Sequence, residues 1–342
     1  MEPLTHFLTG ACLSRAGFNR KTALATATMT LAAEAPDLDI LAGFKGRTFG
    51  FAHHRGFTHS FLGGILVSLL VVGVVYLFWR LRGRKVKYAN LQPRWGLLLL
   101  FAYIASLSHI LLDFTNNYGV RPFWPFSERW YSWDIVFIVD PILLVLLIAG
   151  LALPGLVAFI DRDMGVRHKG PRGKWGATFA LLGVLVVWGT RNYEHRRAVS
   201  ALQTQTFEGA EPIRTSAFPT WWSPFHWNGI VETKTFYAAV PVDLLTTAAD
   251  PDSMQIYYKP AETPVTLAAK QSYLGRVYLD WAEYPLLETE PLENGDYIVR
   301  FRDLRFYRPG TTGRSPLSSS VLLDHNLNVI SEGVGVRGDK FR

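Results

Sequence analysis

The residues best suited to chemistry gather between positions 53 and 60, where the chain reads His-His-Arg-Gly-Phe-Thr-His-Ser. Neutral imidazole is the commonest metal ligand among side chains, so His54 and His59 are candidate ligands. They are five positions apart, too far for one helix face, but a loop could turn both imidazoles inward. Arg55 carries a planar fork of N–H donors that suits an anionic group. We predict His54 and His59 as metal ligands and Arg55 as a catalytic, anion-binding residue.

Similar residues stand at the edges of other apolar runs. His109 and Asp113 are spaced i, i+4, which places both on one face of a helix. Asp37 and Asp39 follow a proline and would point the same way from an extended segment, where carboxylates can bind or bridge cations. The predicted metal ligands are His6, Asp37, Asp39, His54, His59, His109 and Asp113, and Asp39 is also assigned a catalytic role.

Each of these motifs also has a purely structural explanation. The pair at 109 and 113 could face lipid headgroups, and Pro and Asp at 36–39 are common in turns. Ser60 could cap the helix that follows it, and Arg55 could pair with the nearby Asp carboxylates. Cys12 is the only cysteine, which excludes a thiolate cluster, so any metal must take nitrogen and oxygen ligands.

Composition indicates a membrane part joined to a soluble part. The chain has 342 residues, of which 49% are hydrophobic and only 18% are charged. The net charge of +7 comes mostly from short loops between apolar runs, which is the positive-inside pattern of membrane proteins. We therefore expect the lipid bilayer as a partner and no nucleic acid.

Apolar runs at 61–79, 96–112, 141–160 and 175–190 predict four spanning helices, since about 20 residues cross a bilayer. Two shorter runs before them, within residues 4–33, predict a helical hairpin that places His6 near Asp37. The segments 15–21, 80–95 and 161–174 are rich in Lys and Arg, whereas 34–60 and 113–134 are poor in them. Charge counting thus places every candidate ligand on the non-cytoplasmic side.

Beyond about residue 191 the pattern changes to β-branched and aromatic runs separated by turn residues. Strands are expected at 227–240, 254–258, 297–307 and 321–330. The predicted fold is a mainly α multi-pass membrane domain, with about four spanning helices and the N-terminal hairpin, followed by a C-terminal β-rich soluble domain. The predicted domains are 1–190 and 191–342, the second also on the non-cytoplasmic side.

Four motifs together carry a family resemblance over residues 1 to 190: Thr5-His6, Pro36-Asp37-Leu38-Asp39, the stretch 54–60, and Ser108-His109-x-x-x-Asp113. In this order they resemble the membrane-bound, metal-dependent hydrolases described as LexA-binding and inner-membrane-associated (YdjM-like). The resemblance implies a multi-pass bacterial inner-membrane protein and a hydrolase of unassigned substrate. The LexA-binding label is a family name and is not carried to this chain.

A more distant similarity is to zinc-dependent phospholipase C, in which His and Asp ligands hold a metal cluster. That similarity implies metal-ligand roles for five residues here: His6, Asp37, His59, His109 and Asp113. The later His and Glu ligands of the fuller cluster are missing, so one or two divalent ions, zinc or manganese, are expected.

The function expected is hydrolysis by a metal-activated water, on a phosphoester or lipid-linked substrate at the outer membrane face. The alternative is a membrane-anchored sensor or assembly protein, whose metal site would be structural and closed by four protein ligands. A transporter is less favoured, because the polar residues gather at one membrane face and not at mid-depth.

Overall fold

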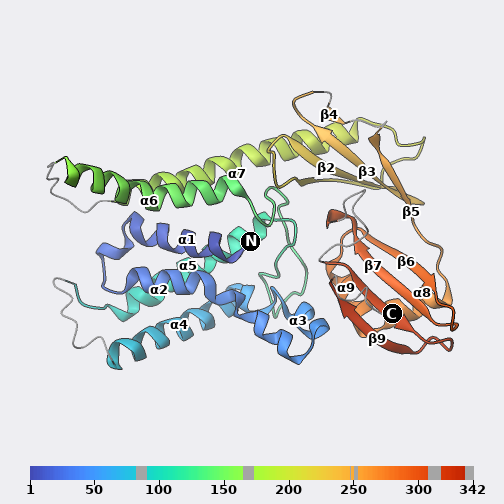
Figure 1. Cartoon of the computed structure of the whole chain (residues 1–342), viewed down its shortest axis with the longest axis horizontal. Coiled ribbons are helices and arrows are strands. Elements are labelled where there is room, and N and C mark those ends of the chain that lie inside the picture. The colour runs from blue at the N-terminus through green and yellow to red at the C-terminus, as the bar shows by residue number, and fades with distance from the viewer. Residues whose placement is uncertain (82–90, 165–172, 247, 250–252, 307–316, 336–342) are drawn as a thin grey trace. The chain divides into compact units, whose positions relative to one another are not determined.

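The computed structural model of the chain describes residues 1–81, 91–164, 173–246, 248–249, 253–306 and 317–335 (Figure 1). Contacts divide the chain into two units, the first made of Met1–Leu38 and Arg55–Tyr193. The second unit comprises Asp39–His54 and Glu194–Arg342. The predicted domain boundary after residue 190 stays a prediction.

Helices build the first unit. They are α1 (Pro3–Ala16), η1 (Phe18–Arg20), α2 (Ala25–Glu34), η3 (Phe57–His59), α4 (Phe61–Leu81), α5 (Trp95–Thr115), α6 (Pro141–Asp163) and the first part of α7 (Lys174–Gln203). A short 3₁₀ segment, η2 (Ala35–Lys45), begins in this unit and continues into the second.

Three helices of the described chain are long and apolar enough to cross a membrane: α4, α5 and residues Pro141–Asp161 of α6. Each of these stretches has 21 residues. At ~1.5 Å per residue that length matches the ~30 Å hydrocarbon core of a bilayer. They coincide with the predicted spans at 61–79, 96–112 and 141–160.

The fourth predicted span, 175–190, is helical as part of α7 but is not among these candidates. The count of four spanning helices is therefore not confirmed. Much of the two basic segments at 80–95 and 161–174 lies outside the described residues.

Close packing holds α1 and α2 together beside α5 (Figure 1). A Cβ atom on Gly10 of α1 would lie 2.7 Å from the Cβ of Ala33 in α2, so only glycine permits this approach. Met29 and Ala33 continue into a buried cluster with Leu98 and Phe101 of α5. The N-terminal helices are thereby fixed against the helix that carries His109 and Asp113.

Antiparallel strands dominate the second unit. One sheet contains β1 (Arg214–Pro219), β2 (His226–Glu232), β3 (Phe236–Asp243), β4 (Ala248–Ala249) and β5 (Gln255–Tyr258), and the other contains β6 (Pro285–Pro291), β7 (Tyr297–Asp303), β8 (Ser319–Leu323) and β9 (Val329–Val334). Three short helices, α3 (Arg47–His53), α8 (Pro264–Gln271) and α9 (Tyr273–Trp281), and the 3₁₀ turn η6 (Leu304–Phe306) belong to this unit as well.

The expected β-rich character of this part of the chain is confirmed, with differences in detail. The run predicted as one strand at 227–240 forms β2 and β3, which pair with each other. The end of the strand predicted at 297–307 reaches residue 307, which lies outside the described residues. Helix α8 was not expected, although Thr263 and Thr266 form a capping box at its start.

Candidate metal centre

Four side chains from distant parts of the chain converge in the helical unit. Single ligand atoms of Asp37, His59, His109 and Asp113 all lie within 4.8 Å of one another. His109 and Asp113 stand one turn apart near the end of α5, whereas His59 comes from η3 and Asp37 from η2. His59, His109 and Asp113 are fully buried, and Asp37 is 24% exposed. This group, called the metal centre below, could hold a metal ion.

The distances within the metal centre suit a shared ion. The Nε2 atoms of His59 and His109 are 3.0 Å apart, and Asp113 Oδ2 lies 3.2 Å and 3.4 Å from them. Asp37 Oδ1 lies 3.4 Å from His59 Nε2 and 3.5 Å from His109 Nε2. Atoms that bind one ion at ~2.0–2.2 Å must be within ~4.4 Å of each other, and these His–His and His–Asp distances satisfy that limit.

Each imidazole has a hydrogen-bond partner on its far side. His109 Nδ1 lies 2.6 Å from the Ala33 carbonyl oxygen, which can only accept, so Nδ1 carries the proton. His59 Nδ1 lies 3.1 Å from the Thr58 hydroxyl, which can accept a bond from it or donate one to it. A neutral imidazole that donates from Nδ1 leaves Nε2 as an acceptor or ligand. If His59 also donates from Nδ1, two Nε2 lone pairs face each other, an arrangement that a cation between them would stabilise.

The backbone before α4 explains how His59 reaches the centre. Arg55 adopts a left-handed conformation, with φ of 55°, which turns the chain into η3. Ser60 then caps α4 by accepting a bond from Gly63 N at 2.9 Å, as one structural explanation of this serine anticipated. A Cβ on Gly63 would lie 1.7 Å from the Phe57 carbonyl oxygen, so glycine is required for the 3₁₀ turn to sit against the helix.

Arg55 is buried and directed at Asp113. Its Nη2 lies 2.9 Å from Asp113 Oδ1, while Nη1 donates to Asn116 Oδ1 at 3.1 Å and to the Gly119 carbonyl at 3.2 Å. The guanidinium also lies over the Tyr118 ring, 4.6 Å from its centroid. Arg55 thus forms an ion pair with Asp113, and this contact fixes the carboxylate that faces the two imidazoles.

His6 lies against the same group. Its ring stacks on His109 with centroids 3.6 Å apart, and its Nε2 lies 3.4 Å from Asp113 Oδ1. Neither ring nitrogen of this buried histidine has a hydrogen-bond partner among the described residues. The amino group of Met1 also contacts Asp113 Oδ1. Positively charged and ligand-type groups thus surround the Asp113 carboxylate.

Asp39 and His54 are placed differently from the other predicted ligands. Both lie in the second unit, where Asp39 Oδ1 and His54 Nδ1 are 2.9 Å apart, and neither is a member of the four-residue group. The extended geometry expected for 36–39 was wrong, because η2 is a 3₁₀ helix. Residues two apart in a 3₁₀ helix point to different sides, so Asp37 and Asp39 diverge.

Asp37 is the ionised member of the centre that lies outside the spanning helices. Burial would raise the pKa of its carboxyl group, but hydrogen bonds and positive charge from the imidazoles of His109 and His59, in the state in which Nε2 carries a proton, outweigh that effect and hold the pKa well below its ordinary value. The centre therefore presents at least one carboxylate anion toward its partly exposed side.

Comparison with known proteins places the chain in a family. The family model described as YdjM inner membrane protein matches residues 1–196, which include every residue of the metal centre. The chain belongs to the YdjM inner membrane protein family. This match confirms the YdjM-like resemblance that the four motifs predicted. It does not show hydrolase activity or a similarity to phospholipase C.

Two relatives extend this YdjM-family assignment. The chain is 27% identical to the uncharacterized protein YfhP of Bacillus subtilis over 320 residues, covering 92% of this chain and 86% of YfhP. It is 38% identical to the inner membrane protein YbcI of Escherichia coli over 110 residues, covering 30% of this chain and 54% of YbcI. No solved structure is a significant match.

Proposed function

We propose that this YdjM-family protein is a membrane-bound hydrolase that holds a divalent metal ion at the metal centre and cleaves a phosphoester in a lipid-linked substrate. The observation that carries the proposal is the pair of Nε2 atoms 3.0 Å apart, with Asp113 Oδ2 and Asp37 Oδ1 both within 3.5 Å of them. Such an arrangement of lone pairs and carboxylates is favourable around a cation.

The donor set fits zinc or manganese. Two imidazole nitrogens and two carboxylate oxygens are borderline to hard ligands, which suit Zn²⁺ and Mn²⁺. The unpartnered nitrogens of His6 offer a fifth donor, so one ion or a pair of ions could be held. A bound divalent ion would supply a water of lowered pKa, near ~7, and would polarise the scissile oxygen.

The chain's own groups would position the reactants. Arg55 holds Asp113 at 2.9 Å and brings a buried positive charge to the centre, which supports its predicted role in binding an anionic phosphoester. Asp37 is the partly exposed member, so substrate and water would approach from its side. Asp39 and His54 bind each other, and we give them no part in this mechanism.

The position of the centre supports a substrate with a lipid part. His109 and Asp113 lie in the last two turns of the spanning helix α5, so the centre is near one membrane surface. A phosphoester of a membrane lipid would be presented at this depth. Charge counting assigns this surface to the non-cytoplasmic side, and that orientation is part of the proposal.

Metal analysis of the purified protein tests the first half of the proposal. Wild type should contain a stoichiometric amount of zinc or manganese, which the double variant His109→Ala, Asp113→Ala should lose. A matched control is His226→Ala, Asp243→Ala, which removes another His–Asp pair, 3.6 Å apart, from the second unit and should keep the metal. Wild-type protein that stays metal-free in metal-replete medium would refute the proposal.

Activity tests the second half. Wild type should hydrolyse one of a panel of phosphoester and phospholipid substrates, and Asp37→Ala should reduce turnover by at least tenfold. Metal binding without turnover on any substrate would favour the second candidate, a membrane-anchored sensor or assembly protein with a structural site. The complete burial of His59, His109 and Asp113 is the observation that supports this candidate, because structural metal sites are closed.

A further inference from the structure

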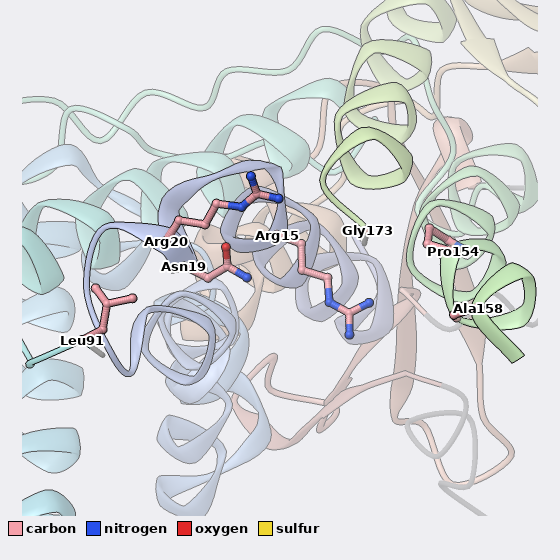
Figure 2. A pocket seen from close by; sticks show the side chains of 8 residues that line it. Arg15, Asn19, Arg20, Leu91, Pro154, Ala158 and Gly173 are labelled. Carbon is pink, nitrogen blue, oxygen red and sulfur yellow. The ribbon is translucent and has the colours of Figure 1, made fainter. Parts of the chain in front are cut away.

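A cavity lined by two arginines and an asparagine lies where the end of α1 and η1 approach α6 (Figure 2). Its volume is about 460 Å³. Arg15, Asn19 and Arg20 line one wall, at the end of α1 and in η1, and Pro154, Gly155 and Ala158 of α6 line another. The cavity is built entirely from the first unit and shares no residue with the metal centre.

The cavity carries positive charge without a lining carboxylate. Its eight described lining residues include two arginines and no Asp or Glu. Arg15 Nη1 donates to the Leu151 carbonyl oxygen at 3.1 Å, which holds the guanidinium against α6. A guanidinium has five N–H donors in a planar fork that matches a phosphate group, so Arg15 can hold this contact and still bind an anion.

Asn19 lines the cavity beside the two arginines. Its Oδ1 is buried and has no hydrogen-bond partner among the described residues. Figure 2 shows the Asn19 amide between the side chains of Arg15 and Arg20. The Oδ1 atom is closed off from the cavity, so Asn19 contributes its amide to the cavity wall and no accessible acceptor. The charged groups that a ligand can meet are the two guanidinium groups, and the cavity therefore suits an anion such as a phosphate group.

The cavity is at the level of a membrane surface. Leu91 precedes the spanning helix α5, Gly173 precedes α7, and Ala158 lies near the end of α6. Trp95 and Trp175 occupy the first turns of α5 and α7, as aromatic residues do at the membrane–water interface. Molecules at this level in a bilayer are lipid headgroups, and basic pockets between helices bind anionic ones.

We propose that this cavity binds the headgroup of an anionic phospholipid, such as phosphatidylglycerol. The phosphate lies between the guanidinium groups of Arg15 and Arg20. The proposal does not depend on the hydrolase function, because the cavity and the metal centre share no residue.

Binding of short-chain phosphatidylglycerol to the full-length protein in detergent, measured by calorimetry, tests the charge requirement. Arg15→Gln combined with Arg20→Gln should weaken binding by at least ~10-fold, since hydrogen bonds to charged groups are worth ~1.5 kcal/mol or more. The matched control is Lys21→Gln, which removes one charge from the same turn but does not line the cavity. Lys21 would not contact the phosphate, and solvent ions screen its charge over longer distances. The variant should therefore change the dissociation constant by less than about twofold.

A second variant tests the cavity itself while every charge is kept. A Cβ on Gly155 would meet nothing within 4 Å, so Gly155→Leu places its side chain in open space and leaves the helix intact. It should weaken phosphatidylglycerol binding by about as much as the arginine variants do. The thermal transition of each variant serves as the check on folding.

The proposal would be overturned by unchanged binding in the double arginine variant, by equal loss in Lys21→Gln, by unchanged binding in Gly155→Leu, or by equal binding of phosphatidylcholine. Inorganic phosphate provides the remaining comparison. Tight binding of phosphate that displaces the lipid fully would identify a free-anion site and refute the lipid assignment. Displacement only at concentrations at least a hundredfold above those of the lipid supports it.

Discussion

The hydroxyl of Thr58 is the most informative single group to remove from the metal centre. Thr58→Val replaces it with a methyl group of similar shape and eliminates the partner that lies 3.1 Å from His59 Nδ1. Without this partner the Nδ1 proton is no longer favoured, and the imidazole can turn or change tautomer. We expect metal affinity to fall ~10- to 100-fold, or about 1.4–2.7 kcal/mol, which is the usual effect of losing the partner of a ligating histidine.

The measurement is a competition titration of metal-free protein with Zn²⁺ against a chromophoric chelator. Ser108→Ala is the matched control, because the Ser108 hydroxyl donates to the Ala105 carbonyl at 2.7 Å, within the helix that carries His109. Its affinity should match wild type within about twofold. Wild-type affinity in Thr58→Val would refute the assignment of Nε2 as the ligand atom of His59, and an equal loss in Ser108→Ala would show a general loosening of the unit.

Three further predictions concern the framework. Arg191→Met removes the ion-pair partner of the buried Asp140 carboxylate, 3.2 Å away, and should lower the free energy of unfolding by about 3–5 kcal/mol. Lys270→Met, whose partner Glu262 is 67% exposed, should cost less than ~1 kcal/mol, and denaturant titration compares the two variants. Burial raises the pKa of Tyr284 from 10.0 to about 12, so the folded state holds its proton longer than the unfolded state does. The contribution of Tyr284 should be complete below pH 10 and fall by about 1.4 kcal/mol per pH unit as the pH rises toward 12. Unfolding curves of Tyr284→Phe should show a smaller alkaline loss than wild type, with the part due to Tyr237, whose pKa burial also raises to about 12, left in place. Gly10→Val should lower the thermal midpoint, at a cost of ~1–3 kcal/mol, because its Cβ would lie 2.7 Å from α2; an unchanged midpoint would contradict the tight packing.

Local geometry explains which features could be predicted from the amino-acid sequence. A spacing of four on an α-helix fixes two side chains on one face, so the meeting of His109 and Asp113 at 3.4 Å follows from the pattern alone. Three helices that are long and apolar enough to span a membrane could be predicted, because length and hydropathy are read directly from the sequence. The fourth predicted span, 175–190, belongs to a helix that continues to Gln203 without a break. The end of an apolar run therefore does not mark the end of the helix there.

Features that depend on tertiary packing could not be predicted in this way. The Ala33 carbonyl oxygen, 76 positions away in the sequence, orients His109. Every residue has a backbone carbonyl, so no sequence motif can identify this contact. Asp37 and Asp39 were expected to point the same way because an extended segment was assumed, whereas η2 is a 3₁₀ helix. The assignment of Asp39 and His54 as ligands stays a prediction. Arg55 has Asp113 as its ion-pair partner, which lies in a segment far along the chain.

The order of the ligands along the chain has a consequence for biosynthesis. Asp37 and His59 are made first, but His109 and Asp113 come from α5, so the set is incomplete until the ribosome has passed residue 113. A nascent chain in the membrane therefore offers an incoming ion only half of its ligands. Because binding to a site assembled by folding adds to folding free energy, an ion held by all four groups would be acquired late and would tie the N-terminal segments to α5. Its presence would mark a chain that has finished assembling this unit.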